Sequence, residues 1–164
     1  MKPLVEHLIS KPLDAGYFLS QRWGREHAGL PSTTQVLATS PWNGWSIVEF
    51  WRSVQEQGLL RIRFQPSVPR FSGKVFVLLD QHSASATELA ADALLASGVA
   101  TLIGEDTAGE MLSQSFFDVA EGYTISLPVA DYFSLAHGRI EGVGVAVDIH
   151  AEDAMATAKA LAVD

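Results

Sequence analysis

The chain has 164 residues, of which 48% are hydrophobic and 18% charged, and its formal net charge is −8. This composition is typical of a globular protein and excludes a disordered chain, while an acidic balance without a basic run argues against nucleic acid or an anionic membrane as partner. Without a single cysteine, disulfides and thiolate metal sites are excluded. We expect one domain over residues 1–164, with no cofactor and no metal.

The N-terminal residues do not resemble a targeting signal. Glu6 and His7 interrupt the short apolar stretch at the start, so a secretory signal is not expected. No stretch approaches the roughly 18 apolar residues that a membrane-spanning helix needs. As it stands, the sequence predicts a soluble, cytoplasmic chain.

The first 41 residues give uneven signals. Leu4, Val5 and Leu8 predict a short helix over residues 2–10, and residues 13–23 are interpreted as a second helical piece. Residues 24–41 are rich in glycine, proline and small polar residues, which indicates irregular structure with a short strand at 35–38.

The segment 46–57 predicts a helix by several independent signals. Ser46 and Glu49 have the spacing of a capping box, in which each side chain satisfies a backbone amide of the first turn. Trp45 and Phe50 stand at the positions of a hydrophobic staple. Apolar residues then recur at helical spacing.

A strand, a helix and a strand follow within about 30 residues. Residues 59–65 alternate apolar and polar side chains, which predicts a half-buried strand. Residues 75–79 are continuously apolar, which is typical of a strand covered on both faces in a parallel sheet. The helix expected over 85–97 and the strand over 99–103 complete a βαβ unit. The fold class is therefore predicted as α/β, with a mostly parallel sheet flanked by helices.

The C-terminal third predicts a hairpin and a last helix. Residues 113–117 and 123–129 have strand patterns on either side of a short turn, and residues 130–135 extend the second strand. A further strand is expected at 145–149 and a terminal helix over 152–162.

Ser85 lies where the predicted buried strand joins the predicted helix. In a parallel α/β sheet this junction is at the edge where ligands bind. A serine there stands at the positive end of the helix dipole, near amides that can stabilise a developing oxyanion. A structural interpretation stands beside this one, because serine is also a common helix N-cap and Ser85 and Glu88 have capping-box spacing.

Three segments in the same order resemble the C-terminal-processing, or tail-specific, serine proteases, a superfamily that includes the tricorn protease core and the interphotoreceptor retinoid-binding protein modules. They are residues 73–90 (GKVFVLLDQHSASATELA), 100–109 (ATLIGEDTAG) and 138–149 (GRIEGVGVAVDI). The resemblance implies a Clp protease/crotonase-like fold. It also implies that the family's substrates, extended peptides or protein C-termini, are the partners, and its members are often exported.

By this resemblance Ser85 is the nucleophile and the Ala86 amide is one oxyanion donor, and Thr107 and Gly109 belong to the substrate-binding loop. In the processing proteases the base is a lysine 25 residues after the nucleophile, a position that Glu110 occupies here. The tricorn-like branch uses a histidine and an acidic residue instead. His27 is then a candidate base.

Glu141 is the candidate acidic member of that tricorn-like arrangement, although a solvated glutamate at a strand edge is the simpler interpretation. His82, three residues before Ser85, is expected to turn away from it. For both His27 and His82 a loop or surface residue is the simpler interpretation.

The family's glycine-rich loop, which supplies a second oxyanion amide and the first core strand, is not found in this sequence. The core is therefore expected to be truncated at its N-terminus, with an exposed sheet edge. Either another chain of a homo-oligomer or the N-terminal segment, repacked over it, is expected to cover this edge.

Three functions remain open at this point. The first is a serine peptidase that forms an acyl-enzyme at Ser85. The second is a catalytically inactive descendant that binds peptides or assembles with other chains, by β-addition along the exposed edge. The third is a crotonase-like acyl or ester hydrolase.

Overall fold

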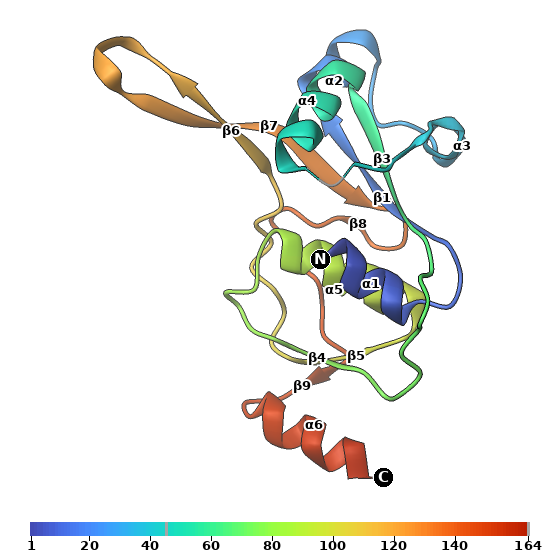
Figure 1. The fold of residues 1–164 in the computed structure, drawn as a ribbon. Coiled ribbons are helices and arrows are strands. Elements are labelled where there is room, and N and C mark those ends of the chain that lie inside the picture. Colours follow the sequence, from blue (N-terminus) through green and yellow to red (C-terminus); the bar gives the residue numbers. More distant parts are fainter. Residues whose placement is uncertain (45, 164) are drawn as a thin grey trace.

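The structure is a computed structural model that describes residues 1–44 and 46–163. It places helix α5 between two β-sheets, with the larger sheet above it and the smaller one below (Figure 1). The helices are α1 (Lys2–Leu8), α2 (Gln21–Glu26), α3 (Thr33–Ala38), α4 (Ile47–Gln57), α5 (Ala86–Ser97) and α6 (Ala154–Val163). No helix in the described part of the chain is long and apolar enough to span a membrane.

The larger sheet has the strand order β2-β3-β1-β7-β6, with β8 paired to β7. Its strands are β1 (Leu13–Ser20), β2 (Pro41–Trp42), β3 (Leu59–Phe64), β6 (Ser113–Asp118), β7 (Thr124–Ser134) and β8 (Gly138–Arg139). All of its pairings are antiparallel except that of β2 with β3. The 3₁₀ turn η1 (Ala120–Gly122) joins β6 to β7.

The smaller sheet is parallel and has the order β4-β5-β9. Its strands are β4 (Phe76–Leu79), β5 (Thr101–Gly104) and β9 (Ile149–His150). Helix α5 connects β4 to β5 and ends at Gly98, whose φ of 66° is the left-handed conformation that terminates helices. The βαβ unit expected from the sequence is thus confirmed.

The expectation of a mostly parallel sheet holds only for these three strands. The βαβ unit does not set the direction of the other strands, because the long strand β1 pairs antiparallel with both β3 and β7. Antiparallel neighbours need no crossover helix, and β6 and β7 are joined by a short turn.

The helical interpretation of residues 13–23 is wrong, because residues 13–20 form β1 and only residues 21–26 are helical. Six consecutive residues of β1 are buried, so the segment has no polar face from which a strand period could be read. The expected strand at 35–38 is also wrong. Ser32 and Gln35 form a capping box there and begin α3.

The helix expected over 46–57 is confirmed as α4, and the Ser46 hydroxyl accepts a hydrogen bond from the Glu49 amide at 3.4 Å. The staple residue Trp45 lies outside the described residues. The strand expected at 145–149 is shorter than expected, because only Ile149 and His150 pair with β5. The hairpin and the terminal helix are confirmed as β6–β7 and α6.

Strand β3 is more deeply buried than its alternating sequence suggests. Arg61 is 6% exposed, and its guanidinium donates to the Asp14 carboxylate at 2.7 Å and to the carbonyls of Leu37 and Thr39. The Arg61 charge is therefore paired with a carboxylate inside the protein rather than exposed to water.

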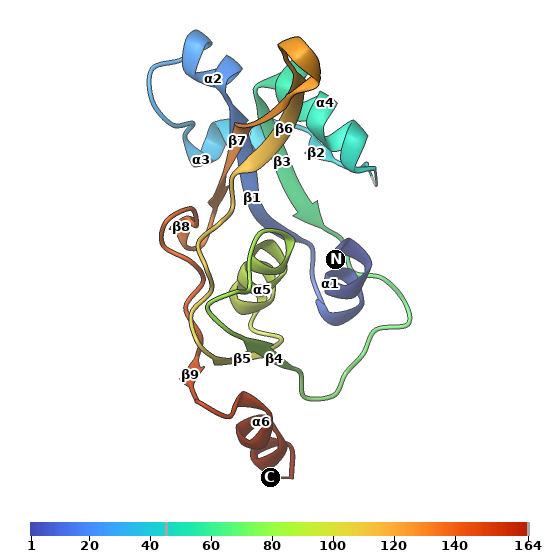
Figure 2. The same ribbon diagram turned by 90° about the vertical axis from the view of Figure 1, so that its left-hand side faces the viewer.

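One hydrophobic core connects the two sheets through α5. It contains Phe18 of β1, Leu89 and Leu94 of α5, and Leu102 of β5. Turned by 90°, the structure still shows α5 between the sheets with α1 beside it (Figure 2). Residues before and after α5 therefore meet around the N-terminal end of this helix.

Candidate active site

Ser85 is the residue immediately before α5, and its backbone is strained. Its φ of 57° and ψ of −118° lie outside the regions that residues with a side chain normally occupy. Such a conformation costs on the order of 1–3 kcal/mol and persists only where the surrounding contacts enforce it. Ser85 is also exposed, so its side chain is accessible.

The turn between β4 and Ser85 is held by Asp80. Its carboxylate accepts hydrogen bonds from the Ser83 hydroxyl and the His82 amide, both at 3.0 Å. These hydrogen bonds, that of Ser83 first, lower the pKa of the Asp80 carboxyl below its ordinary value. Ser83 therefore has a structural partner in this turn, and His82 is exposed.

The segment 107–110 runs alongside the residues before α5. The Ala108 amide donates to the Ser83 carbonyl at 2.9 Å, and the Ser85 amide donates to the Glu110 carbonyl at 3.2 Å. These two bonds fix the strained residue against a neighbouring segment of chain. They also bring Glu110, at the position of the family lysine, next to Ser85.

Glu88 is the buried acceptor that holds this arrangement together. It is completely buried and accepts four hydrogen bonds, from the Ser85 amide (2.9 Å), the Thr107 hydroxyl (2.6 Å), the Gly109 amide (2.7 Å) and the Glu110 amide (3.0 Å). From its sequence spacing Glu88 is expected to have only a capping role. Its other three donors come from a segment about twenty residues away, and no local pattern predicts that contact.

Thr107 and Glu141 support the same loop from its two ends. Thr107 is buried, and its hydroxyl oxygen accepts a hydrogen bond from the Val145 amide at 2.7 Å while donating to Glu88. The Glu141 carboxylate accepts from the amides of Met111 (2.6 Å) and Leu112 (2.9 Å). Both side chains therefore contact the loop itself, and Glu141 forms no bond to a histidine among the described residues.

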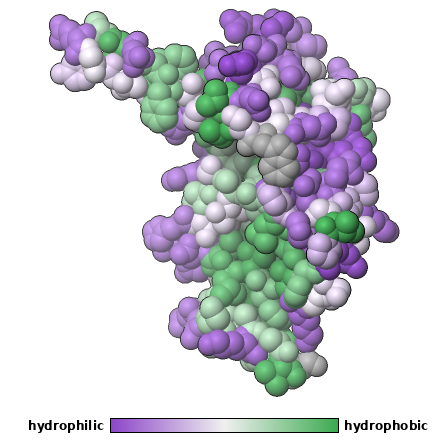
Figure 3. Space-filling view, viewed as in Figure 1, coloured by the Kyte–Doolittle hydropathy of each residue, from purple (hydrophilic) through white to green (hydrophobic). Residues whose placement is uncertain are grey.

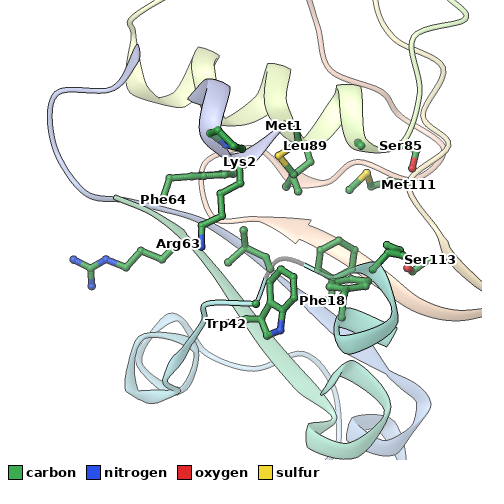
Figure 4. A pocket seen from close by; sticks show the side chains of 16 residues that line it. Met1, Lys2, Phe18, Trp42, Arg63, Phe64, Ser85, Leu89, Met111 and Ser113 are labelled. Carbon is green, nitrogen blue, oxygen red and sulfur yellow. The ribbon is translucent and has the colours of Figure 1, made fainter. Parts of the chain in front are cut away.

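Two hollows meet at Ser85. The first is an apolar cavity of about 320 Å³, with Ser85 and Met111 at one end and Lys2 and Phe64 at the other (Figure 4). Further lining residues are mostly apolar and include Phe18, Trp42, Ile62, Ala86 and Leu89. We call this the apolar cavity.

The second hollow has a volume of about 540 Å³ and a more polar lining. Two carboxylate side chains, Glu110 and Glu141, line it together with Ser85. Ser113 lines both hollows. Ser85 therefore stands between the two hollows.

The histidine side chains lie away from the Ser85 hydroxyl in their hydrogen bonds and ring contacts, and Lys2 is at the opposite end of the apolar cavity (Figure 4). The His27 ring stacks on Trp23 at a centroid distance of 3.8 Å, at the end of α2 and at the opposite end of the larger sheet from α5 (Figure 1). His27 is therefore not brought to Ser85. Lys2 lines the apolar cavity, a placement that depends on the packing of α1 against α5 and has no sequence signal.

The Ala86 amide is the first of α5 and donates to no group among the residues that the structure describes. It is next to the Ser85 side chain and at the positive end of the helix. It therefore has the position and the unused hydrogen that an oxyanion donor needs.

A strained, exposed serine between a strand and a helix is typical of the nucleophile elbow of serine hydrolases. Residues 29–151 match the model of peptidase family S41, and the chain belongs to this family.

Curated relatives include carboxyl-terminal-processing proteases. That of Picosynechococcus sp. is 34% identical over 96 residues, which cover 58% of this chain and 23% of the relative. That of Synechocystis sp. is 42% identical over 72 residues, which cover 44% of this chain and 17% of the relative. The chain thus matches less than a quarter of the length of either relative.

Solved structures give a consistent result for the fold. A protein from Parabacteroides merdae superposes with a TM-score of 0.68 at 14% identity, over 99% of this chain and 47% of its own. The photosystem II D1 C-terminal processing protease superposes with a TM-score of 0.51 at 29% identity, over 58% of this chain and 25% of its own.

Proposed function

We propose that this chain is a serine peptidase domain of the tail-specific type, in which Ser85 is acylated by a peptide substrate. The observation that carries the proposal is the backbone of Ser85. A purely structural N-cap needs no positive φ, because ordinary N-caps lie in the extended region. The strain at Ser85 is enforced by Glu88 and Glu110 and aims an exposed hydroxyl at two hollows.

The site residues divide into reacting and positioning groups. The Ser85 oxygen bonds to the peptide carbonyl carbon, and the Ala86 amide donates to the carbonyl oxygen as it becomes negative. The C–N bond then breaks, the hydroxyl proton passes to the leaving amine, and water releases the acyl group. Glu141, Thr107 and Gly109 position the loop that lines the second hollow.

The reaction also needs a general base that accepts the proton of the Ser85 hydroxyl. Glu110 lines the same hollow as Ser85, but a carboxylate is a weak base for a serine hydroxyl. Two other groups would meet the need for a base: a residue of another chain, or Lys2 after it moves along the apolar cavity.

Peptides or protein C-termini are proposed as substrates, because the curated relatives are carboxyl-terminal-processing proteases.

The arrangement of α5 between the parallel sheet of its βαβ unit and the larger sheet supports a Clp protease/crotonase-like assignment of the fold. A shared hydrophobic core supports one domain over the whole chain.

A second candidate is a peptide-binding domain without turnover. It is favoured by Glu110 at the lysine position and by the edge strand β4, which pairs only with β5 among the described strands. Such an edge accepts an extended peptide by β-addition.

A fluorophosphonate probe distinguishes the two functions. We expect the wild-type chain and Ser113→Ala to be labelled and Ser85→Ala to remain unlabelled, because Ser113 lines the same hollows but lacks the elbow. Equal labelling of the three proteins would contradict a nucleophilic Ser85. No labelling of any of them, with saturable binding of an apolar peptide by tryptophan fluorescence, would establish the second function instead.

A further inference from the structure

The β6–β7 hairpin projects from the body of the protein. In Figure 1 its far half extends beyond all other elements. The pairing runs from Ser113↔Ala130 to Asp118↔Thr124, and η1 closes it. An isolated two-stranded ribbon is only marginally stable in water, so a ribbon of this length is expected to be covered.

The two faces of the ribbon differ in chemistry. One face is mixed: its Ser126 hydroxyl donates to Gln114 at 2.6 Å and its Thr124 hydroxyl donates to Asp118 at 3.2 Å, while Phe116, opposite Ser126, is 66% exposed. The opposite face carries a stripe of apolar side chains, each 41–69% exposed. The stripe consists of Phe117, Val119, Tyr123, Ile125 and Leu127. We call this the apolar stripe.

The stripe continues at its base into a hollow of about 350 Å³ between the hairpin and the helices α2 and α4. Phe117 and Leu127 form its hairpin side, and Arg22, Arg25 and Gln55 contribute from the two helices. Arg22 is paired with Glu26, whereas Arg25 forms no ion pair among the described residues. The hollow is therefore apolar on one side and cationic on the other.

The tip of the hairpin has the opposite charge. Asp118 and Glu121 are exposed there, and no basic residue occurs between Ser113 and Asp131. Figure 3 shows hydrophilic side chains at the end of the arm and hydrophobic ones behind it. The arm thus carries an acidic tip and an apolar stripe, and its base has an apolar, cationic hollow.

We propose that the hairpin is the dimerisation arm of this protein and that its occupant is a second copy of the chain. Two arms lie antiparallel with their apolar stripes in contact, and the acidic tip of each copy enters the cationic hollow of the other. The arrangement is isologous, because one surface carries both complementary parts, and a two-fold axis buries both stripes at once. It does not depend on whether Ser85 is acylated.

Sedimentation equilibrium of the full chain tests the proposal. We expect a dimer, which Phe117→Ser and Ile125→Ser convert to a monomer. Met155→Ser on α6 is the matched control, since Met155 is 52% exposed at the opposite end of the molecule and is expected to leave the dimer intact. Circular dichroism melts confirm that each variant is folded. A wild-type chain that stays monomeric, or a dimer that both hairpin variants leave unchanged, overturns the proposal.

Charge reversal tests the register of the two arms. Arg25→Glu and Glu121→Arg are each expected to raise the dimer dissociation constant about tenfold or more, because symmetry places two like-charged contacts in every dimer. The double variant restores the opposite charges and is expected to recover most of the wild-type affinity. Additive losses in the double variant contradict the proposed contact between tip and hollow.

The absence of natural cysteine allows a direct test of the contact. One sample carries Tyr123→Cys in the tip and the other carries Gln55→Cys in the hollow. Mixed and oxidised, they are expected to give a disulfide-linked heterodimer in preference to either linked homodimer. If the linked homodimers predominate, the two arms do not cross in the proposed way.

Discussion

Ser85 keeps its unusual backbone because the chain contacts it from two directions. The Glu88 carboxylate and the Glu110 carbonyl both accept from its amide, and the turn around Asp80 fixes the preceding residues. Its exposed side chain stands at the start of α5 in a capping box with Glu88. Acylation further requires a neighbour that removes the hydroxyl proton.

Replacing Glu110 by lysine is expected to supply that neighbour. The backbone of residue 110 already bonds to Ser85, and its side chain lines the same hollow. A neutral amine there acts as general base, so labelling by a fluorophosphonate should accelerate by on the order of 10²–10⁴ and rise with pH as the lysine loses its proton. Labelling time courses between pH 6 and 10 measure this.

Glu110→Gln is the control, since it removes the negative charge without adding a base. If Glu110→Gln accelerates labelling as much as Glu110→Lys, the effect is electrostatic and no base has been supplied.

Tyr132 and Asp92 are completely buried, and the exposed His137 joins them in a cluster of hydrogen bonds. Its hydroxyl donates to Asp92 at 3.2 Å, and His137 Nδ1 lies 2.6 Å from the same carboxylate. Burial, followed by the charge of Asp92 and the hydrogen bond to it, raises the pKa of Tyr132 well above its ordinary value of 10.0. The folded protein therefore retains a proton that the unfolded chain releases.

The free energy of unfolding should consequently fall at alkaline pH. The contribution of Tyr132 is fully present below about pH 10 and is lost above it, by up to about 1.4 kcal/mol per pH unit. Tyr132→Phe removes this contribution, so its stability should fall less steeply than that of the wild type. Urea titrations from pH 8 to 11 compare the slopes, and equal slopes would refute the assignment. Tyr17, whose pKa burial also raises, is unchanged in both proteins.

At the scale of elements, Glu88 joins helix α5 to the loop after β5. Each of its two carboxylate oxygens accepts two hydrogen bonds. Thr107 and Gly109 donate to Oε1, and the amides of Ser85 and Glu110 donate to Oε2. The helix, the loop and the strained serine are therefore one hydrogen-bonded unit.

Glu88→Gln should remove two of the four hydrogen bonds that hold this unit together. An amide nitrogen in place of Oε2 would face two N–H donors, and each buried unsatisfied group costs about 1–3 kcal/mol, so the variant is expected to lose about 2–5 kcal/mol of unfolding free energy. Urea denaturation measures the loss. Glu49→Gln, in the exposed first turn of α4, is the control and should lose less than about 1 kcal/mol.

At the scale of the whole molecule, α5 makes the two sheets parts of one core. Leu102 of the smaller sheet and Phe18 of the larger one belong to the same buried cluster. Trp23, Trp42 and Trp51 belong to α2, β2 and α4, which build the upper region around the larger sheet (Figure 1). Tryptophan fluorescence therefore reports on the region opposite the smaller sheet.

Leu102→Ala is expected to destabilise both regions equally. Removing this fully buried side chain costs about 2–5 kcal/mol, and a cooperative protein transmits the loss to every probe. The unfolding midpoints from tryptophan fluorescence and from far-ultraviolet circular dichroism should shift together. Separate midpoints would show that the sheets unfold independently and would argue against one domain.

The sequence predicted the part of this architecture that is encoded locally. The βαβ unit, Ser85 at its junction and the hairpin each have a short-range pattern. Strand β1 does not, because it is buried on both faces between β3 and β7 and therefore lacks alternation. The contacts of Glu88, the approach of Lys2 to the apolar cavity and the distance of His27 from Ser85 depend on tertiary packing.

The free edge of β4 also makes ligand binding visible without any turnover. In a strand paired on one side only, every second amide points away from its neighbour and is open to solvent. These amides should exchange deuterium rapidly, while the amides that face β5 remain protected. A peptide that adds to this edge would slow deuterium exchange at alternate residues of Phe76–Leu79. This alternating pattern of protection would distinguish β-addition from binding in either hollow.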